Sequence, residues 1–493
     1  MAIELSNIVF TDQDDIVPLS GVEQILNTGV ANTLAGNDSI TGIGGNIGIE
    51  NVGTLNTDEG NDPITGTGTN YGIVTRYGSI LDTGKGNDVI TGTSTLYNSS
   101  GFSNMGTSNT GGDNDIITGN GGYYGFQNMG ILNTDDGNDT ITGTSSYYGI
   151  YTHQRSTFDT GEGHDVIAGT GTNFGIYIYD GSTFDTGKGN DVITGTGSSG
   201  FLNYGKVKTG DGEDSIISQG DFKNLHYDYY GRNEGLFLGD GNDSIIITST
   251  DPVDSPDPSL YNTSTFDTGE GNDTITITGF IRNGGFINMG NDDDSIISRG
   301  LSNYGSGVFL GEGNDSITLN AADPTSFALE NSRPLETGDG NDIITSTGTI
   351  YNRGIINTGN GDDSIIVDNP GTRYGYGIYN IGTINTGDGN DSIIANEGFE
   401  SHLSGLKMLG IVFLRDGEDY IKGFGNGDFY GGNGNDTLEL TPGSYTVGIE
   451  DTSVTFTKNG VGLMITSDFE NLIAGSAIYD FTSLTAGQII VVA

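Results

Sequence analysis

The sequence predicts an all-β protein folded as a parallel β-helix, or β-solenoid, with about 17 coils of about 25 residues and a small β-rich C-terminal cap. Three observations lead to this prediction: a Gly-Asp-Gly-Asn-Asp-like turn recurs along the chain, an isoleucine column follows it, and an apolar column precedes it. The composition agrees with them. Of 493 residues 86 are glycine and only 33% are hydrophobic, which suits a narrow stacked core better than several large ones.

The two columns flank an aspartate that closes each turn. Isoleucine stands two residues after this aspartate, as at Ile40 and Ile90, and only the last copy replaces it with Leu438. An apolar residue stands seven positions before it, as at Leu55 and Phe158. β-Branched residues with period-two flanks favour strands over helices, so we expect one strand on each side of the turn.

A looser segment separates one turn from the next. Examples are the stretches 71–73, 148–150 and 285–290, which contain Tyr-Gly-Ile or Gly-Phe-x-Asn-x-Gly patterns. We interpret this segment as a third short strand, so that each coil is one turn of a parallel β-helix. The repeats occupy residues 33–438, with an N-terminal cap at 1–32.

The C-terminal region, residues 439–493, departs from the repeat. It reads as short strands with a hairpin at Lys458-Asn459-Gly460 and an apolar terminus from Ile489 to Val492. We expect a β-rich cap, which would protect an open end of the solenoid from edge-to-edge association.

Charge and cysteine content restrict the function. The chain has 65 acidic and 17 basic residues, a formal net charge of −48, which opposes binding to nucleic acid or anionic lipid and predicts that cations offset the repulsion. Without cysteine it cannot depend on disulfides or thiolate zinc sites. The sequence shows neither a transmembrane segment nor a cleavable N-terminal signal.

Calcium is the cation that the turns favour. It prefers six to eight hard oxygens, and stacked turns offer aspartate carboxylates together with carbonyls that glycine can point inward. We therefore expect Ca²⁺ between coils, up to about one ion per gap. The open alternative is that Asp and Asn only form corners through hydrogen bonds to the backbone. The expected metal ligands are Asp38, Asp62, Asp88, Asp115, Asp139, Asp165, Asp191, Asp214, Asp243, Asp273, Asp294, Asp315, Asp342, Asp363, Asp391, Asp419, Gly432, Gly434 and Asp436.

Six of these turns lack one glycine, and we expect weaker calcium sites there. The first glycine is missing in the turns of Asp38, Asp62, Asp139 and Asp419, and the second in those of Asp115 and Asp294.

The run Gly431-Gly432-Asn433-Gly434-Asn435-Asp436-Thr437-Leu438 resembles the nonapeptide of the repeats-in-toxin, or hemolysin-type calcium-binding, family. The resemblance implies calcium-dependent folding outside the cell, and residues 439–493 look like the uncleaved signal that such proteins present to type I exporters. The spacing departs from the family, whose coils are shorter and carry two such loops, so calcium would be limited to one edge of each coil.

No catalytic motif is present, and we do not expect an enzyme. Tyr148 to His153 faintly resembles a motif of polysaccharide epimerases but lacks its Asp and Pro, which leaves a polysaccharide lyase or epimerase as a minor alternative. Rows of Thr-Gly-Thr, as at Thr65 to Thr67 and Thr91 to Thr93, raise an ice-binding alternative, and exposed tyrosines raise glycan binding. The preferred reading is a secreted, extracellular calcium-binding protein with a structural, adhesive or surface-layer role, whose partners are calcium, cell-surface glycans or further copies of itself.

Overall fold

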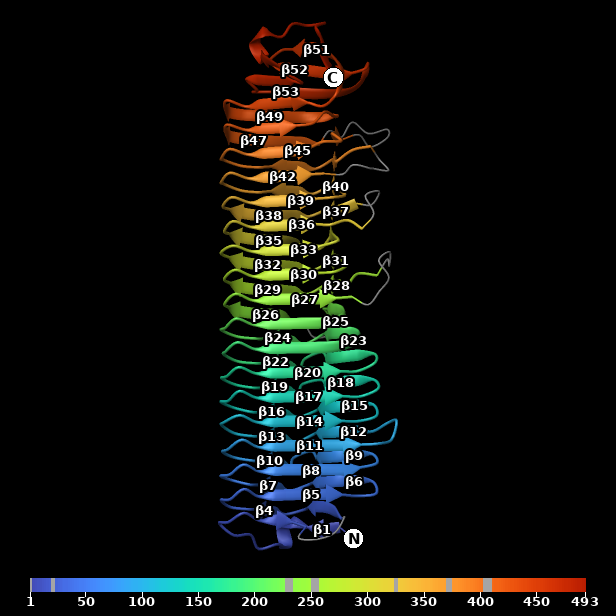
Figure 1. Cartoon of the computed structure of the whole chain (residues 1–493), viewed down its shortest axis with the longest axis vertical. Coiled ribbons are helices and arrows are strands. Elements are labelled where there is room, and N and C mark those ends of the chain that lie inside the picture. The colour runs from blue at the N-terminus through green and yellow to red at the C-terminus, as the bar shows by residue number, and fades with distance from the viewer. Residues whose placement is uncertain are drawn as a thin grey trace. The chain divides into compact units, whose positions relative to one another are not determined.

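The computed structural model describes residues 2–18, 23–226, 234–249, 257–322, 327–368, 375–401 and 410–493. The chain divides into two compact units, the first made of Met1–Pro252 and Ser259–Thr268, the second of Val253–Pro258 and Gly269–Ala493. Both are built from parallel ladders of short strands, as expected for a parallel β-helix (Figure 1). The described residues contain no α-helix, only the 3₁₀ turns η1 (Leu5–Asn7) and η2 (Phe481–Ser483).

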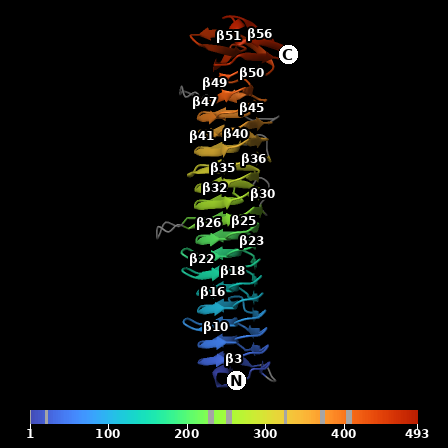
Figure 2. The ribbon, with the colours of Figure 1, turned by 90° about the vertical axis from the view of Figure 1, so that its left-hand side faces the viewer.

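Each coil of the first unit contributes one strand to each of three ladders. The first ladder holds the strands that follow the aspartate of the turn, the second holds the middle strands, and the third holds the strands that lead into the next turn. Figure 2 shows strands of the third ladder, β10, β16 and β22, one above another. The stacking therefore carries the side chains of each coil over those of the coil before.

The strands of the first unit are assigned to the ladders as follows. The first ladder contains β2 (Ile16–Val17), β5 (Ser39–Ile43), β8 (Pro63–Gly68), β11 (Val89–Ser94), β14 (Ile116–Asn120), β17 (Thr140–Thr144), β20 (Val166–Thr170), the starts of β23 (Val192–Asn203) and β25 (Ser215–Asn224), and β27 (Ser244–Thr248). The second contains β1 (Ala2–Glu4), β3 (Gln24–Asn27), β6 (Ile47–Asn51), β9 (Tyr71–Thr75), β12 (Ser100–Asn104), β15 (Tyr124–Asn128), β18 (Tyr148–Thr152), β21 (Phe174–Ile178), the ends of β23 and β25, and β28 (Leu260–Asn262). The third contains β4 (Val30–Asn32), β7 (Thr54–Asn56), β10 (Ile80–Asp82), β13 (Thr107–Asn109), β16 (Ile131–Asn133), β19 (Thr157–Asp159), β22 (Thr183–Asp185), β24 (Lys206–Lys208) and β26 (Gly235–Asp240).

The second unit repeats the pattern, and β29 (Thr265–Glu270) spans the boundary in the sequence. Its first ladder contains β30 (Thr274–Ile277), β33 (Ser295–Ser298), β36 (Ser316–Leu319), β39 (Ile343–Ser346), β42 (Ser364–Val367), β45 (Ser392–Ala395), β48 (Tyr420–Lys422), β50 (Thr437–Leu440) and β54 (Asn471–Ala474). The second contains β31 (Phe280–Asn283), β34 (Gly300–Asn303), β37 (Phe327–Asn331), β40 (Thr349–Asn352), β43 (Ile378–Asn380) and β46 (Phe399–Glu400). The third contains β32 (Phe286–Asn291), β35 (Gly307–Glu312), β38 (Pro334–Asp339), β41 (Ile355–Asn357), β44 (Thr383–Asn385), β47 (Ile411–Gly417), β49 (Gly427–Gly434) and β53 (Val461–Ser467).

The core is formed by the two apolar columns that the sequence predicts. Every residue of the isoleucine column, from Ile40 to Leu438, and every residue of the preceding column, from Ala31 to Phe429, is at most 2% exposed. Ser108 is the polar exception of the second column and is also fully buried, with its hydroxyl 3.1 Å from Asn104 Oδ1. Register is therefore strongly specified, because a slip by one residue would expose the whole column.

A buried asparagine ladder follows the second ladder of strands. In the second unit Asn283 Nδ2 donates to Asn303 Oδ1 at 3.2 Å, and Asn303 Nδ2 donates to Asn331 Oδ1 at 2.9 Å. Asn303 Nδ2 also donates to the carbonyl of Pro334 at 2.8 Å. Each amide thus links two coils and fixes the corner between the second and third strands, which satisfies a buried polar group at every step.

Close glycine contacts flatten the coils of the first unit. A Cβ on Gly92 in β11 would lie 2.3 Å from the carbonyl oxygen of Gly101 in β12, and one on Gly143 in β17 would lie 2.2 Å from that of Gly149 in β18. Only glycine permits this approach of two backbones within one coil.

The stretch from Gly285 to Gly290, which we expected to be a third strand of the Tyr-Gly-Ile kind, is a different element. It forms most of β32, which pairs with β35 in the third ladder, while β31 supplies the middle strand of that coil. Coils of the second unit are short here, so the Phe-x-Asn pattern of a middle strand and that of a lead-in strand are easily confused. The middle strands expected at 71–73 and 148–150 are confirmed as parts of β9 and β18.

The ends of the chain join the ladders. At the N-terminus β2, β3 and β4 pair in parallel with β5, β6 and β7. At the C-terminus β51 (Gly443–Glu450), β52 (Ser453–Lys458) and β53 form an antiparallel meander, and β56 (Ile489–Val492) pairs with β51. β55 (Ala477–Asp480) pairs with β54. The predicted hairpin is confirmed, with Asn459 and Gly460 at φ 51° and 77°.

Candidate functional site

In each unit the aspartates of the turns form a buried column, and we call these seventeen residues together the aspartate column. Its members, from Asp38 to Asp436, precede the strands of the first ladder, and each is at most 1% exposed. Sequence reasoning placed these residues at an edge of each coil but did not foresee that the carboxylates would be withdrawn from solvent. Burial of a charge requires a partner or a proton, so the arrangement of each carboxylate decides what the column can do.

One oxygen of each carboxylate joins two coils. In the first unit Asp165 N–H donates to Asp191 Oδ1 at 2.8 Å, and Asp191 N–H donates in turn to Asp214 Oδ1 at 2.8 Å. The same bond recurs in the second unit from Asp273 to Asp436, where it is 2.7–3.0 Å long. This oxygen performs the corner role that the sequence left open as an alternative.

The other oxygen of the carboxylate is the unusual one. In fifteen members of the column Oδ2 is buried and has no hydrogen-bond partner among the described residues: Asp38, Asp62, Asp88, Asp115, Asp139, Asp165, Asp191, Asp214, Asp294, Asp315, Asp342, Asp363, Asp391, Asp419 and Asp436. A buried acceptor without a donor is costly, and native proteins keep few of them. Because the arrangement repeats in coil after coil, we infer that this oxygen binds a ligand or a proton.

Burial raises the pKa of these carboxyls far above the usual range of aspartate. The pKa of Asp88 and of Asp191 rises to about 7, and that of Asp115 and Asp294 to about 8. Neighbouring carboxylates of the column add to the rise, and the amide of the preceding aspartate opposes it. A column of this kind binds either protons or cations at neutral pH.

A threonine column lies beside the aspartates, five residues before them. Thr160 Oγ1 donates to the carbonyl of Thr186 at 3.1 Å, and Thr186 Oγ1 donates to that of Thr209 at 3.2 Å. These threonines are fully buried, and their hydroxyls lower the pKa of the adjacent carboxyls in part. Because each hydroxyl also donates to the next coil, it offsets only part of the effect of burial on the adjacent carboxyl.

In most turns the residue just before the aspartate takes part in a second ladder, which runs the other way. Asn138 Oδ1 accepts from His164 N–H at 2.7 Å, and His164 Nδ1 accepts from Asn190 N–H at 2.7 Å. Histidine therefore takes the place of asparagine in this turn, as its position in the repeat predicts. The aspartates bind the coil before them and the asparagines bind the coil after them, so a turn that has both bonds is held from both sides.

The turns that lack a glycine keep the shape of the others. Leu34, Asp58, Asp135 and Arg415 stand at the first glycine position with φ of 71°, 64°, 59° and 84°. Asp113 and Asp292 stand at the second with φ of 83° and 80°. These are left-handed values that side chains other than glycine adopt with strain, most of all a residue such as leucine. The ladder bonds therefore impose the turn even where the sequence resists it.

The fit of a hard cation to this column is partial. Carboxylate oxygens suit calcium, and each of the fifteen aspartates named above supplies one that is otherwise unsatisfied. Across the part of the chain that the structure describes, however, no three His, Asp or Glu side chains converge as a metal site. The carbonyls of the turn are partly occupied, since Gly163 N–H donates to Lys188 O at 2.7 Å. Further oxygens would have to come from the backbone or from water.

Two outer faces of the first unit carry the alternatives considered from the sequence. The threonine rows are in register on the first ladder: Thr65 lies beside Thr91, and Thr67 beside Thr93. Thr142 and Thr144 continue these rows in β17, and Thr194 and Thr196 continue them in β23. Ala168 interrupts the first row and Asn120 interrupts the second. The face is free of charge over these coils and regular along the stack.

Aromatic rings line the second ladder of the first unit. The rings of Tyr124 and Tyr148 stack at 5.3 Å and 9°, and Tyr148 stacks on Phe174 at 5.1 Å and 12°. His153 stacks on Tyr179 in the same way, so the stretch from Tyr148 to His153 is part of a ladder of rings. Stacked rings cover each other's faces, which leaves mainly edges and hydroxyls to meet a sugar.

Comparison with known proteins adds no relative: no protein-family model matches the chain, and no curated protein matches it. Within the described ranges, no helix is both long and apolar enough to cross a membrane. The interpretation of the site therefore depends on its own geometry.

Proposed function

We propose that the protein is a secreted calcium-binding protein of structural, adhesive or surface-layer type, whose repeats fold when calcium binds between the coils. The observation that carries the proposal is the buried, unpartnered Oδ2 oxygen that recurs along the aspartate column. The resemblance of the turns to the repeats-in-toxin family supports the same reading and adds export through a type I exporter, with residues 439–493 as the signal.

The charge balance supports calcium over protons as the partner at neutral pH. Fifteen gaps between neighbouring aspartates within the units, eight in the first and seven in the second, would bring 30 positive charges against the formal −48 at one divalent ion each. Without a cation, neighbouring carboxylates about 4.8 Å apart repel each other at every step of the stack. Protons would remove this repulsion only below the raised pKa values, which lie at about 6 to 8.

Far-UV circular dichroism of the full chain, with chelator and then with calcium, tests the proposal together with a count of bound metal. We expect a weak strand signal in chelator, a full signal in millimolar calcium, and several bound ions per chain. A strand signal that chelation leaves unchanged at about pH 8, with no bound metal, would contradict calcium-dependent folding. Magnesium serves as the control cation, because it holds its water and demands a tighter octahedral geometry.

The threonine rows favour a second candidate, ice binding by the first unit. Two uncharged rows stand in register at the strand spacing over several coils. We expect thermal hysteresis of the calcium-loaded protein if this face binds ice, and its loss on Thr142→Lys in the middle of the rows. The absence of hysteresis would remove this candidate without touching the calcium proposal.

A further inference from the structure

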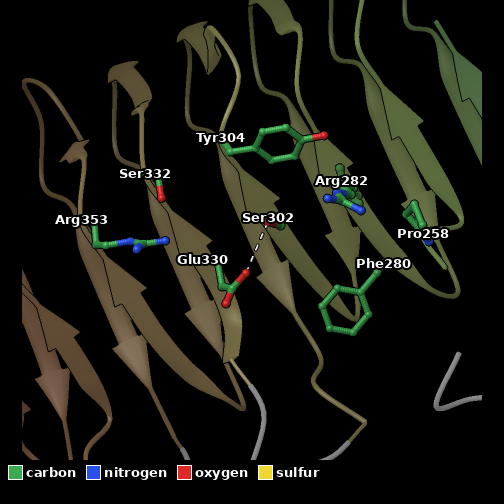
Figure 3. Close-up of a pocket in the computed structure, with 9 residues that line it drawn as sticks. Pro258, Phe280, Arg282, Ser302, Tyr304, Glu330, Ser332 and Arg353 are labelled. Carbon is green, nitrogen blue, oxygen red and sulfur yellow. Dashed lines mark hydrogen bonds between the residues drawn. The ribbon is translucent and has the colours of Figure 1, made fainter. Parts of the chain in front are cut away.

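The second unit carries a groove that lies away from the aspartate column. It has a volume of about 460 Å³ and lies on the outer side of β31, β34, β37 and β40 (Figure 3). Its lining mixes rings, hydroxyls and charges: Phe280, Arg282, Ser302, Tyr304, Glu330 and Arg353. This mixture differs from the stacked rings of the first unit and from the uncharged threonine rows.

Two arginines in this lining stand out in a strongly acidic chain. The protein has 17 basic against 65 acidic residues, yet Arg282 and Arg353 line one groove and Arg333 lies at its border, where its Nε donates to the carbonyl of Tyr304 at 3.1 Å. Arg282 and Arg353 are exposed. Guanidinium groups bind carboxylates in a two-pronged geometry, so the groove presents local sites for an anion on a protein that repels anions elsewhere.

Aromatic rings hold both arginines in place. The guanidinium of Arg282 lies 5.3 Å from the ring centre of Tyr304, and that of Arg353 lies 5.0 Å from the ring centre of Tyr351. The ring of Tyr304 lies over Gly284, where an added Cβ would come within 2.8 Å of ring atoms. The positions of the charged groups are therefore fixed before any ligand arrives, which lowers the entropy lost on binding.

The ladder register orders the groove into four steps. Arg282 lies beside Ser302, Ser302 beside Glu330, and Glu330 beside Tyr351, whose ring carries Arg353. Successive strands are about 4.8 Å apart, a length comparable to one pyranose ring in a glycan chain. A linear sugar polymer that crosses the strands would thus meet one step per unit.

The order of chemical groups favours a sugar with spaced acidic groups. The outer steps offer Arg282 and Arg353 to carboxylates, while the inner steps offer Ser302, Ser332 and Glu330, which exchange hydrogen bonds with hydroxyls. Tyr304, which is 37% exposed, carries the guanidinium of Arg282 over its ring and so holds the first arginine at this step. A carboxylate at Glu330, midway between the arginines, disfavours a densely anionic chain such as a nucleic acid.

We propose that this groove binds an acidic oligosaccharide of about four units, with uronic acid carboxylates at the two arginines and hydroxyl-bearing units between them. This gives the adhesive part of the proposed function a class of partner and stands apart from calcium binding, since metal counts test the one and glycan binding the other.

Isothermal titration of the full, calcium-loaded chain tests the proposal, with a tetrasaccharide that carries galacturonic acid as its first and fourth units and galactose between them. We expect binding that weakens with added salt and is lost for the neutral galactose tetrasaccharide. The double variant R282Q/R353Q should reduce the affinity at least about tenfold, because it removes two charge-assisted contacts. R299Q is the matched control, because Arg299 lies in the same unit outside the lining. Its affinity should match that of the unaltered chain, and circular dichroism should show all variants folded.

Four results would overturn the proposal. The first two are no measurable binding of the acidic tetrasaccharide and equal binding of the neutral one. The third is a loss of affinity in R299Q equal to that in R282Q/R353Q. The fourth is unchanged affinity in R282Q/R353Q, which calcium ions bridging the sugar to the acidic surface would produce. A fifth result, tighter binding of tetraglutamate than of the tetrasaccharide, would also overturn it and would assign the groove to an acidic peptide instead.

Discussion

Replacing Asp191 with asparagine separates the two roles of the aspartate column. Asparagine keeps the oxygen that accepts from Asp165 N–H at 2.8 Å, so the bond between the two coils can persist. It replaces the unpartnered Oδ2 with an uncharged amide nitrogen that is a poor ligand for a cation. Shape and hydrogen bonding change little, whereas charge and metal affinity change fully.

The magnitude follows from the pKa of this carboxyl. Burial raises the pKa of Asp191 from its ordinary 3.8 to about 7, and Asp165 and Asp214 add to the rise. At a pH above both the ordinary and the raised pKa, this shift corresponds to a destabilisation of the folded state by about 4 kcal/mol, because the buried carboxylate is then charged. If the column binds no cation, D191N should relieve up to about 4 kcal/mol of local strain. If calcium neutralises the column, D191N should instead remove a ligand from the adjacent gaps and loosen them.

Hydrogen exchange of the amides around Asp165 and Asp191, measured in calcium at about pH 8, gives the local free energy of opening, and a count of bound metal accompanies it. We expect faster exchange and the loss of one or two ions in D191N. Lys188→Ala in the same turn is the control, since the side chain of Lys188 is exposed and its Nζ lies 3.8 Å from Glu162 Oε1, a pair of little energetic weight. Slower exchange with an unchanged metal count would refute the calcium reasoning, because it would show that the buried charge of Asp191 destabilises the turn and binds no cation.

Four further predictions concern the dependence of stability on pH and the effects of three substitutions. In chelator, residual structure should be most stable near about pH 4 and should be lost as pH rises through about 6 to 8, because carboxyls with raised pKa values bind more protons in the folded chain than in the unfolded chain. Circular dichroism across this pH range measures the effect. A rise in stability with pH would contradict it. Gly143→Ala should cost at least about 1 to 3 kcal/mol in thermal or urea unfolding because its Cβ would meet a backbone oxygen at 2.2 Å, whereas Gly45→Ala, which meets nothing within 4 Å, should be nearly neutral. Leu34→Gly should stabilise its turn by about 1 kcal/mol, seen as slower local exchange, since φ is 71° there. Ile193→Asp should disrupt local stacking by burying a charge at a fully buried site, and local protection equal to that of K188A would show that inside and outside are misplaced.

Much of the fold could be predicted from the sequence because residues at equivalent positions of successive repeats are of the same type and occupy the same face of each coil. The isoleucine at two residues after each aspartate is buried from Ile40 to Leu438, since its position relative to the turn sets which face of the strand it occupies. The hairpin at Asn459-Gly460 followed from turn chemistry alone, because both residues adopt positive φ.

The remaining features depend on distances between backbones, which a sequence pattern does not report. Asn303 was visible only as part of an Asn-x-Gly motif, and its bond to Asn331 appears only when the coils are stacked. The burial of the aspartates could not be read from an Asp-containing turn, which is compatible with either face. The groove was missed because Arg282 and Arg353 occur in coils of unequal length and follow no repeated pattern.

The aspartate ladder also bears on how the chain reaches its folded state. Its bonds join residues 17 to 29 positions apart, from Asp419 with Asp436 to Asp214 with Asp243, so each closes a loop of about one coil. Closing short loops of similar length costs similar entropy, and no bond of this ladder must wait for a distant part of the chain. Folding of each unit can therefore nucleate at any coil and propagate to the neighbouring coils, and it can begin while the rest of the chain is still unfolded.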